Sequence, residues 1–246
     1  MQETTRLSKR EKRILRQQAK TTEGAKPNHG LEMRNLSPLT QKQRDMFEAF
    51  RAGKNLMAHG IAGTGKTFLA IALALEEIFS GLSSYRRIIV VRSVVPTRDI
   101  GFLPGDEKQK SEVYEAPYSQ ICTELFNRGD AYALLKHKGT IDFISTSYIR
   151  GVTINDAIVI VDEMQNMSFH ELDSIITRLG KNSKIIFCGD FRQSDFTKEQ
   201  ERSGLKNFMT IIQKMKAFEF IDFEKSDIVR SPLVKSYIIT KSDLNL

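Results

Sequence analysis

The feature that most constrains this chain is a short glycine-rich run, Gly60-Ile61-Ala62-Gly63-Thr64-Gly65-Lys66-Thr67. It fits the pattern G-x-x-x-x-G-K-[ST], follows an apolar stretch at residues 55–58, and precedes a long helical pattern that opens at Lys66. Glycines let the backbone curl until its N–H groups point inward at phosphates, beside the positive end of the helix. The lysine then reaches the β- and γ-phosphates, and the threonine hydroxyl ligates Mg²⁺. The run therefore predicts a phosphate-binding loop for ATP and magnesium, with the next residue, Phe68, as a further nucleotide contact.

Strand-like and helical patterns alternate along most of the chain. Short apolar runs occur at residues 56–58, 88–91, 141–144, 158–161, 185–188 and, more weakly, 218–223. Helical patterns fill residues 40–50, with Thr40 as N-cap, and residues 66–79, 118–126, 169–179 and 204–215. Short β-branched runs separated by helices are typical of a parallel sheet covered on both faces. The sequence predicts one α/β domain over residues 36–246, with a mostly parallel sheet and helices on both faces.

Two acids follow the fourth apolar run. Residues 157–161 have the pattern of a buried strand, and Asp162 and Glu163 come directly after it. A strand beside a phosphate loop delivers such an acid to the magnesium shell, so Asp162 joins Thr67 as a predicted metal ligand. Glu163 is placed to act as general base on the attacking water. The alternative is an acidic start to the helix near residue 169, which pairing with the phosphate loop disfavours.

A second polar motif, Gly189-Asp190-Phe191-Arg192-Gln193, follows the fifth apolar run. A polar group at this strand end can sense whether the γ-phosphate is present. An amide bonds both water and phosphate oxygen, so hydrolysis can be converted into a loop movement. We predict that Gln193 has this role, and a simple Gly-Asp turn is the alternative.

Positive charge is concentrated at the start of the chain. Residues 1–35 hold nine Lys or Arg against four Glu, which accounts for most of the net charge of +7. A basic arm favours a polyanion such as RNA or DNA, and a solvated, flexible tail is the alternative. The basic start has no apolar core, and no stretch approaches the ~18 apolar residues of a membrane span. We therefore expect a cytoplasmic protein without membrane contact, in which Cys122 and Cys188 are reduced.

Several motifs resemble those of superfamily 1 helicases. The runs Asp162-Glu163-Met164-Gln165 and Gly189-Asp190-Phe191-Arg192-Gln193 are similar to helicase motifs II and III. The run Leu39-Thr40-Gln41-Lys42-Gln43 is similar to the adenine-reading Q-motif. That resemblance points to Gln43 as the adenine contact.

Residues 36–236 as a whole resemble the PhoH family of phosphate-starvation-type ATPases. Further matching segments are Gly101-Phe102-Leu103-Pro104-Gly105-Asp106, Tyr148-Ile149-Arg150-Gly151, Thr177-Arg178-Leu179-Gly180 and Asp227-Ile228-Val229-Arg230-Ser231-Pro232-Leu233-Val234. Met164 stands where the family usually has Ala, and Ser231 where it often has His. Longer members add a PIN-type, nuclease-like domain, for which we expect no room here. The resemblance implies ATP hydrolysis, a RecA-like core, ring-shaped oligomers such as hexamers, and a link to RNA.

Charge that develops on the γ-phosphate needs a cation beyond Lys66, usually an arginine finger. Superfamily 1 helicases supply it from a second RecA-like domain, and this sequence shows only one. We therefore predict that the finger comes from a neighbouring subunit, with Arg230, Arg178 and Arg150 as candidates in that order. Each is alternatively a surface or salt-bridge arginine.

A polar insertion from Gly101 toward Tyr118 follows the second apolar run. In helicases the corresponding edge meets single-stranded nucleic acid through backbone contacts and stacking rings. The candidate contacts are Arg92, Arg98, Phe102 and Tyr114, which are alternatively structural or subunit-interface residues.

Two functions remain open on the sequence. The first is an oligomeric ATPase that remodels or moves along RNA or single-stranded DNA. The second is an ATP-controlled switch or assembly protein that unwinds nothing. Stimulation of ATP hydrolysis by nucleic acid distinguishes them. Phosphoryl transfer to a small acceptor is weaker, because Glu163 suits water activation and the sequence has no arginine-rich acceptor lid.

Overall fold

The computed structural model describes residues 30–94, 107–190 and 199–244. Its centre is a six-stranded sheet with the strand order β3-β2-β4-β5-β1-β6, in which every neighbouring pair is parallel. The strands are β1 (Asn55–Gly60), β2 (Arg87–Arg92), β3 (Ile141–Ser145), β4 (Ala157–Val161), β5 (Ser183–Gly189) and β6 (Phe218–Phe223). All six apolar runs are therefore strands, and the predicted parallel sheet is confirmed.

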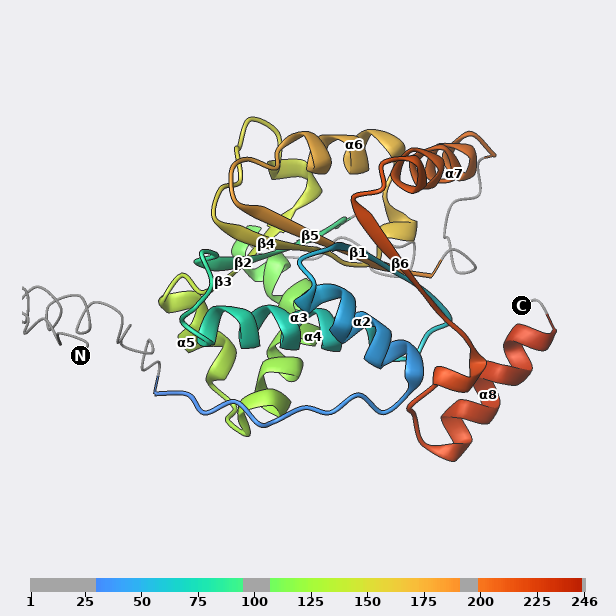
Figure 1. Ribbon diagram of the computed structural model, residues 1–246, viewed down its shortest axis with the longest axis horizontal. Helices are drawn as coiled ribbons and strands as arrows, with labels where there is room; N and C mark the ends of the chain where they lie inside the picture. Colours follow the sequence, from blue (N-terminus) through green and yellow to red (C-terminus); the bar gives the residue numbers. More distant parts are fainter. Residues whose placement is uncertain (1–29, 95–106, 191–198, 245–246) are drawn as a thin grey trace, which may run out of the picture.

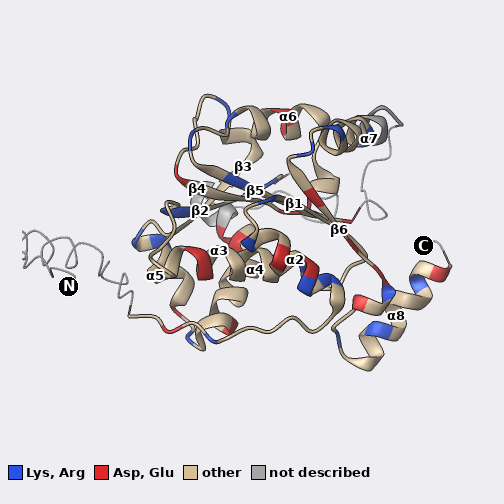
Figure 2. Ribbon diagram, viewed as in Figure 1, with Lys and Arg blue, Asp and Glu red and all other residues tan. Residues whose placement is uncertain are grey.

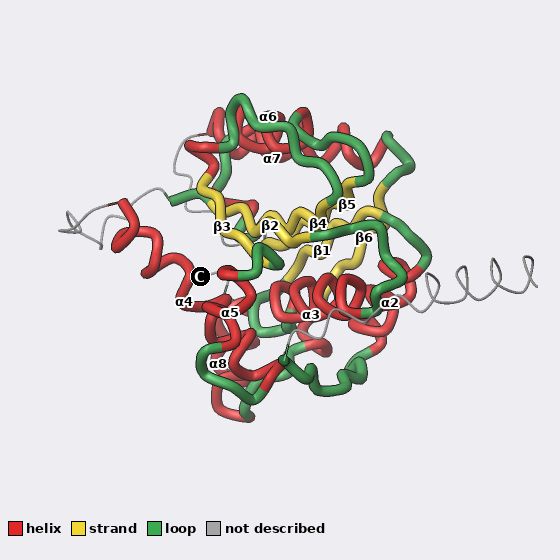
Figure 3. Tube along the Cα trace, turned by 90° about the vertical axis from the view of Figure 1, so that its left-hand side faces the viewer, coloured by secondary structure: helices red, strands yellow, loops and turns green. Residues whose placement is uncertain are grey.

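Helices cover both faces of the sheet (Figures 1 and 3). Alternate side chains of each strand serve two cores, so that Leu56 and Ala58 pack on one face and Met57 on the other. Burial on both faces explains the continuous apolar runs in the sequence. One face carries α2 (Gln41–Arg51), α3 (Lys66–Phe79), α4 (Glu107–Phe126) and α5 (Ala131–His137), and the other carries α6 (Phe169–Thr177) and α7 (Glu199–Lys214).

Local signals account for where several helices begin. Thr40 caps α2 as predicted, because its hydroxyl accepts a hydrogen bond of 3.3 Å from the backbone N–H of Gln43. Ser168 and Glu171 form a reciprocal capping box at the start of α6. These caps define where the two helices begin, near the carboxyl ends of the strands.

Three helical stretches differ from the sequence prediction. Helix α4 begins at Glu107, within the predicted polar insertion, and the sequence pattern predicted no helix at α5 or at α8 (Pro232–Asp243). No residue of α8 is buried, and Leu233 and Tyr237 are 81 % and 67 % exposed. A helix that buries so little imposes no apolar periodicity on its sequence, which is why the pattern did not show it.

The packed body begins before residue 36. Leu31 and Met33 pack against the core, and the N–H of Arg34 donates to the carbonyl of Leu125 at 2.9 Å. Residues 1–29 of the basic segment lie outside the described residues. In the described body, basic and acidic residues are interspersed (Figure 2).

The two cysteines are buried and form no disulfide, as expected. Burial raises the pKa of the Cys122 thiol to about 12, so it stays protonated. Within the described ranges, every helix is too short or too polar to cross a bilayer.

The strand order gathers several chain segments at one edge of the sheet. Strand β5 lies between β4 and β1. At their carboxyl ends, β1 leads into the glycine-rich run, β4 into Asp162 and Glu163, and β5 into Asp190. Ligands of open parallel sheets bind beyond these carboxyl ends. The fold therefore brings the predicted nucleotide residues together.

Candidate nucleotide-binding site

The glycine-rich run forms a tight turn between β1 and α3. Gly60, Gly63 and Gly65 have positive φ angles of 119°, 80° and 87°, which residues with a Cβ rarely adopt. The buried hydroxyl of Thr64 donates to the carbonyl of Ile61 at 3.1 Å and closes the turn. Gly65 is the N-cap of α3, and no side chain caps this helix end. The helix therefore presents its first N–H groups and the positive end of its dipole to the loop, as phosphate binding requires.

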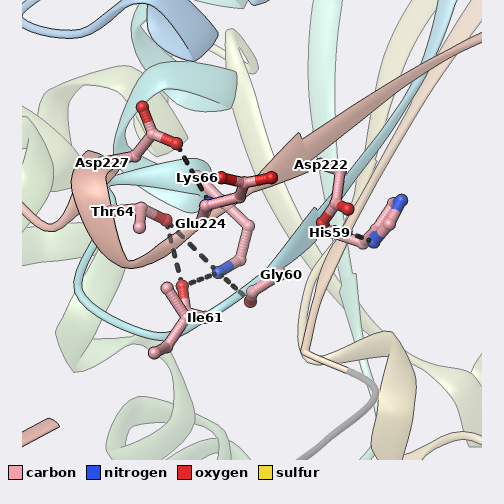
Figure 4. A network of polar contacts seen from close by, with 8 residues as sticks. All are labelled: His59, Gly60, Ile61, Thr64, Lys66, Asp222, Glu224 and Asp227. Atoms are coloured by element: carbon pink, nitrogen blue, oxygen red, sulfur yellow. Dashed lines mark hydrogen bonds and ion pairs between the residues drawn. The ribbon is translucent and has the colours of Figure 1, made fainter. Parts of the chain in front are cut away.

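The Lys66 side chain folds back over this loop. Its ammonium donates to the carbonyls of Gly60 and Ile61, both at 2.8 Å (Figure 4). Burial lowers the pKa of Lys66, and the negative charges of Asp190 and Glu163 oppose that shift. The ammonium thus lies between the loop and the acids that follow β4 and β5.

Asp162 lies between two hydroxyl groups. The Thr67 hydroxyl donates to Oδ1 at 2.6 Å, and the Tyr118 hydroxyl donates to Oδ2 at 2.9 Å. Only 4 % of Asp162 is exposed. Hydroxyl and carboxylate oxygens are the hard ligands that magnesium prefers. The structure therefore joins the two residues predicted to hold magnesium, and their donor set fits that ion.

Glu163 has an unusual backbone conformation. Its φ of 52° places a residue with a side chain in the left-handed region, at a cost of about 1–2 kcal/mol, and such strain clusters at functional sites. Burial and the charge of Asp162 raise the pKa of Glu163, whereas Gln165, Arg92 and Lys66 favour its charged form. The left-handed turn directs the chain into a short 3₁₀ helix, Met164–Asn166.

Gln165 links the ends of β4 and β5, a role that the sequence did not reveal. Its amide NH₂ donates to Glu163, and its amide oxygen accepts from the backbone N–H of Asp190 at 3.0 Å. A Cβ at Gly189 would lie 2.6 Å from that oxygen and 2.6 Å from a side-chain carbon of Met164. Gly189 is thus required for the close approach of Gln165. The Gly189-Asp190 pair therefore does more than form a simple turn.

Tyr118 and Arg92 also reach the acids. Tyr118 comes from α4 and is fully buried, and burial and Asp162 raise its pKa, so its hydroxyl keeps the proton that it donates. Arg92 is the last residue of β2 and interacts electrostatically with Tyr118. Burial alone would lower the pKa of Arg92, but Tyr118, Asp162 and Glu163 outweigh it and raise the pKa. Arg92, a candidate nucleic-acid contact in the sequence, therefore faces the acids.

Gln43 contacts the phosphate loop directly. Its amide NH₂ donates to the carbonyl of Thr64 at 3.0 Å, and its amide oxygen accepts from the N–H of Leu39 at 2.8 Å. The side chain is 3 % exposed. Both ends of the amide thus have backbone partners, and contact with adenine stays a prediction.

Two of the three candidate arginines lie at the carboxyl edge. Arg230 is exposed, but its Cγ lies 3.1 Å from where a Cβ on Gly63 would stand, and the N–H of Val229 donates to the Gly63 carbonyl at 3.1 Å. Arg150 is exposed in the turn after β3. Arg178 is the C-cap of α6, at the opposite edge where β5 starts. Arg230 is therefore the one that borders the loop of its own subunit.

Other predicted residues are less informative here. Phe68 lies in the first turn of α3, and its partly buried ring packs against the core. Tyr114 is half-buried on α4. Gln193, Arg98 and Phe102 lie outside the described residues.

Comparison with known proteins supports a family assignment. The family model described as PhoH-like protein matches residues 35–241. A PhoH-like protein of Synechocystis sp. is 36 % identical over 200 residues, covering 81 % of this chain and 60 % of the relative. Protein PhoH of Escherichia coli is 32 % identical over 207 residues, covering 82 % and 58 %. The chain thus spans about 60 % of the length of these relatives.

Solved structures show more distant similarity. A large terminase from a thermophilic bacteriophage aligns over 82 % of this chain and 50 % of its own, with a TM-score of 0.49 and 12 % identity. A Pif1 helicase of Candida albicans aligns over 85 % and 44 %, with a TM-score of 0.42 and 16 % identity. The parallel sheet and the loop between β1 and α3 make this an α/β P-loop NTPase fold. With the family match over residues 35–241, the chain belongs to the PhoH family.

Proposed function

We propose that this protein hydrolyses ATP with Mg²⁺ at the carboxyl edge of its sheet. The observation that carries the proposal is the 2.6 Å hydrogen bond between Thr67 and Asp162. This bond joins the end of the phosphate loop to the predicted metal ligand Asp162, and Glu163 is the next residue in the chain. The Thr67 hydroxyl, the metal-binding carboxylate of Asp162 and the general base Glu163 then surround the position of a terminal phosphate. Hydrolysis needs this arrangement.

Each side chain has a distinct task in this proposal. Backbone N–H groups of the loop and of α3 bind the phosphates, and Lys66 exchanges its carbonyl partners for phosphate oxygens. Thr67 and Asp162 hold magnesium, which when bound offsets the negative charge on the phosphate oxygens. Glu163 takes the proton of the attacking water. Gln193 is proposed to sense the γ-phosphate, and Gln43 the adenine.

We further propose that the ATPase acts on RNA or single-stranded DNA, as a cytoplasmic ring-shaped homo-oligomer such as a hexamer. The support is the basic segment at residues 1–35 and the helicase-like order of the motifs. Single-stranded RNA or DNA should therefore stimulate ATP hydrolysis severalfold in steady-state assays. The stimulation should weaken as salt rises, because phosphate contacts release counterions.

A Glu163→Gln variant is the control for contaminating ATPases in that assay. Hydrolysis that depends on Glu163 but ignores nucleic acid of either kind would reject the nucleic-acid role. It would favour the ATP-controlled switch, and protein partners would become the target.

Mixed subunits can locate the arginine finger. Arg230→Ala should lower ATP hydrolysis, and mixing this variant with Glu163→Gln should not restore activity. The side chain of Arg230 lies beside Gly63 of its own chain, which favours action within its own subunit over the predicted action on a neighbour. Recovery in the mixture would show action across the interface, because only a mixed pair then combines an intact Glu163 with an intact Arg230.

A further inference from the structure

Asp162 cannot fix its own orientation. The terminal torsion of an aspartate side chain is broad, so the carboxylate needs partners on both oxygens to hold one setting. Thr67 engages Oδ1 at 2.6 Å, on the side of the phosphate loop. The contact on Oδ2 comes from outside the phosphate loop, from a residue that would not itself bind the metal. That contact is the hydroxyl of Tyr118 at 2.9 Å.

Packing around the ring restrains the position of the Tyr118 hydroxyl. The ring is fully buried and packs against Phe143, with 5.9 Å between ring centroids. One turn earlier on α4, the buried carboxylate of Glu115 accepts hydrogen bonds from Tyr132 at 2.7 Å and from Lys136 at 2.6 Å, both on α5. These bonds hold α4 against α5 close to Tyr118, the residue of α4 that contacts Asp162.

Arg92 supports the same contact from the neighbouring strand. Strand β2 pairs with β4, and Val91 lies opposite Val161, so Arg92 leaves the sheet beside Asp162. Its guanidinium interacts electrostatically with Tyr118 and with the carboxylates of Asp162 and Glu163. A cation at this point favours the ionised carboxylates, and ionised Asp162 accepts the Tyr118 proton in a charge-assisted hydrogen bond.

We propose that Tyr118, supported by Arg92, is a positioning residue that holds the Asp162 carboxylate in the orientation that binds magnesium. The inference rests on the proposed function, because it takes Asp162 as a magnesium ligand. In this proposal the packing of α4 contributes to the metal site, although Tyr118 is not itself a metal ligand. Partners that orient metal-binding carboxylates affect metal affinity or activity by about 10–100-fold.

Tyr118→Phe tests the proposal, because it removes only the hydroxyl and keeps the packed ring. We expect the Mg²⁺ concentration for half-maximal ATP hydrolysis to rise about tenfold, the lower end of that range. ATP binding in EDTA, measured by calorimetry, should be unchanged. Mn²⁺, which binds the same hard ligands more tightly, should recover part of the lost activity.

Tyr132→Phe is the matched control. It also removes one buried hydroxyl that donates to a carboxylate, in the same helix pair, without touching Asp162. In Tyr132→Phe, Lys136 still holds Glu115 and so keeps α4 on α5. Both variants should therefore lose thermal stability to a similar extent, and only Tyr118→Phe should shift the Mg²⁺ dependence. An unchanged Mg²⁺ dependence in Tyr118→Phe, or an equal shift in both variants, would overturn the proposal.

Two further measurements keep the test decisive. If Tyr118→Phe does not fold, Arg92→Gln should raise the same Mg²⁺ concentration, and no rise there rejects the arrangement. If the wild-type protein hydrolyses no ATP, the proposed function fails by itself. The degree to which Mg²⁺ strengthens ATP binding then replaces the activity readout, and it should fall about tenfold in Tyr118→Phe.

Discussion

Replacing Glu163 by Gln should nearly abolish ATP hydrolysis and leave ATP binding intact. The new side chain keeps the size of the old one, and its amide oxygen can still accept the hydrogen bond that Gln165 donates. What is lost is the carboxylate that takes the proton of the attacking water, a contribution of about 10²–10⁴-fold in rate. Steady-state kcat and a calorimetric Kd for ATP measure the two effects separately.

Glu163→Asp is the matched control for charge. It keeps the carboxylate but withdraws it by one methylene group, so we expect activity between the wild type and Glu163→Gln. A Gln variant that keeps more than about a tenth of the wild-type kcat would show that another group accepts the proton. A Gln variant that no longer binds ATP would instead give Glu163 a structural role.

Much of the sheet and its phosphate loop could be predicted because their signals are local. A strand buried on both faces needs a continuous apolar run, and such runs correctly marked all six strands. The loop pattern includes its own strand and helix, so a short window was enough to place α3. Asp162 and Glu163 were found for the same reason, because they end a strand of this kind.

The side chains that support these acids have no local signal. Tyr118 and Asp162 are joined by a contact between distant parts of the sequence, and Tyr118 has the pattern of an ordinary core aromatic on α4. Arg92 could be predicted only as a nucleic-acid contact or a structural residue until the register of β2 against β4 was known. Gln165 was part of a motif, but its bond to the Asp190 backbone depends on β4 and β5 being neighbours. Nonlocal geometry, rather than residue type, decides each of these roles.

Gly60→Ala should be among the most destabilising single substitutions in this chain. The sequence suggests that Gly60 is needed for the curl of the phosphate loop, and its φ of 119° agrees. The structure adds a second cause, because a Cβ at Gly60 would lie 2.1 Å from the carbonyl oxygen of Phe223. That oxygen also accepts the N–H of Ile61 at 3.1 Å, so the clash would separate β1 from β6 where they pair. We expect a loss of at least about 4 kcal/mol in the free energy of unfolding, measured by urea denaturation.

Gly53→Ala separates the two causes. Gly53 also has a positive φ, of 80°, but a Cβ there would meet nothing within 4 Å. It should therefore cost only the backbone term, about 1–2 kcal/mol. Equal losses in the two variants would mean that β6 moves away from β1 freely and that Gly60 serves the loop alone. A much larger loss at Gly60, together with loss of ATP binding, would show that the pairing of β1 with β6 holds the phosphate loop in shape. The first glycine of the motif would then be fixed as much by a strand far along the chain as by the phosphate that it helps to bind.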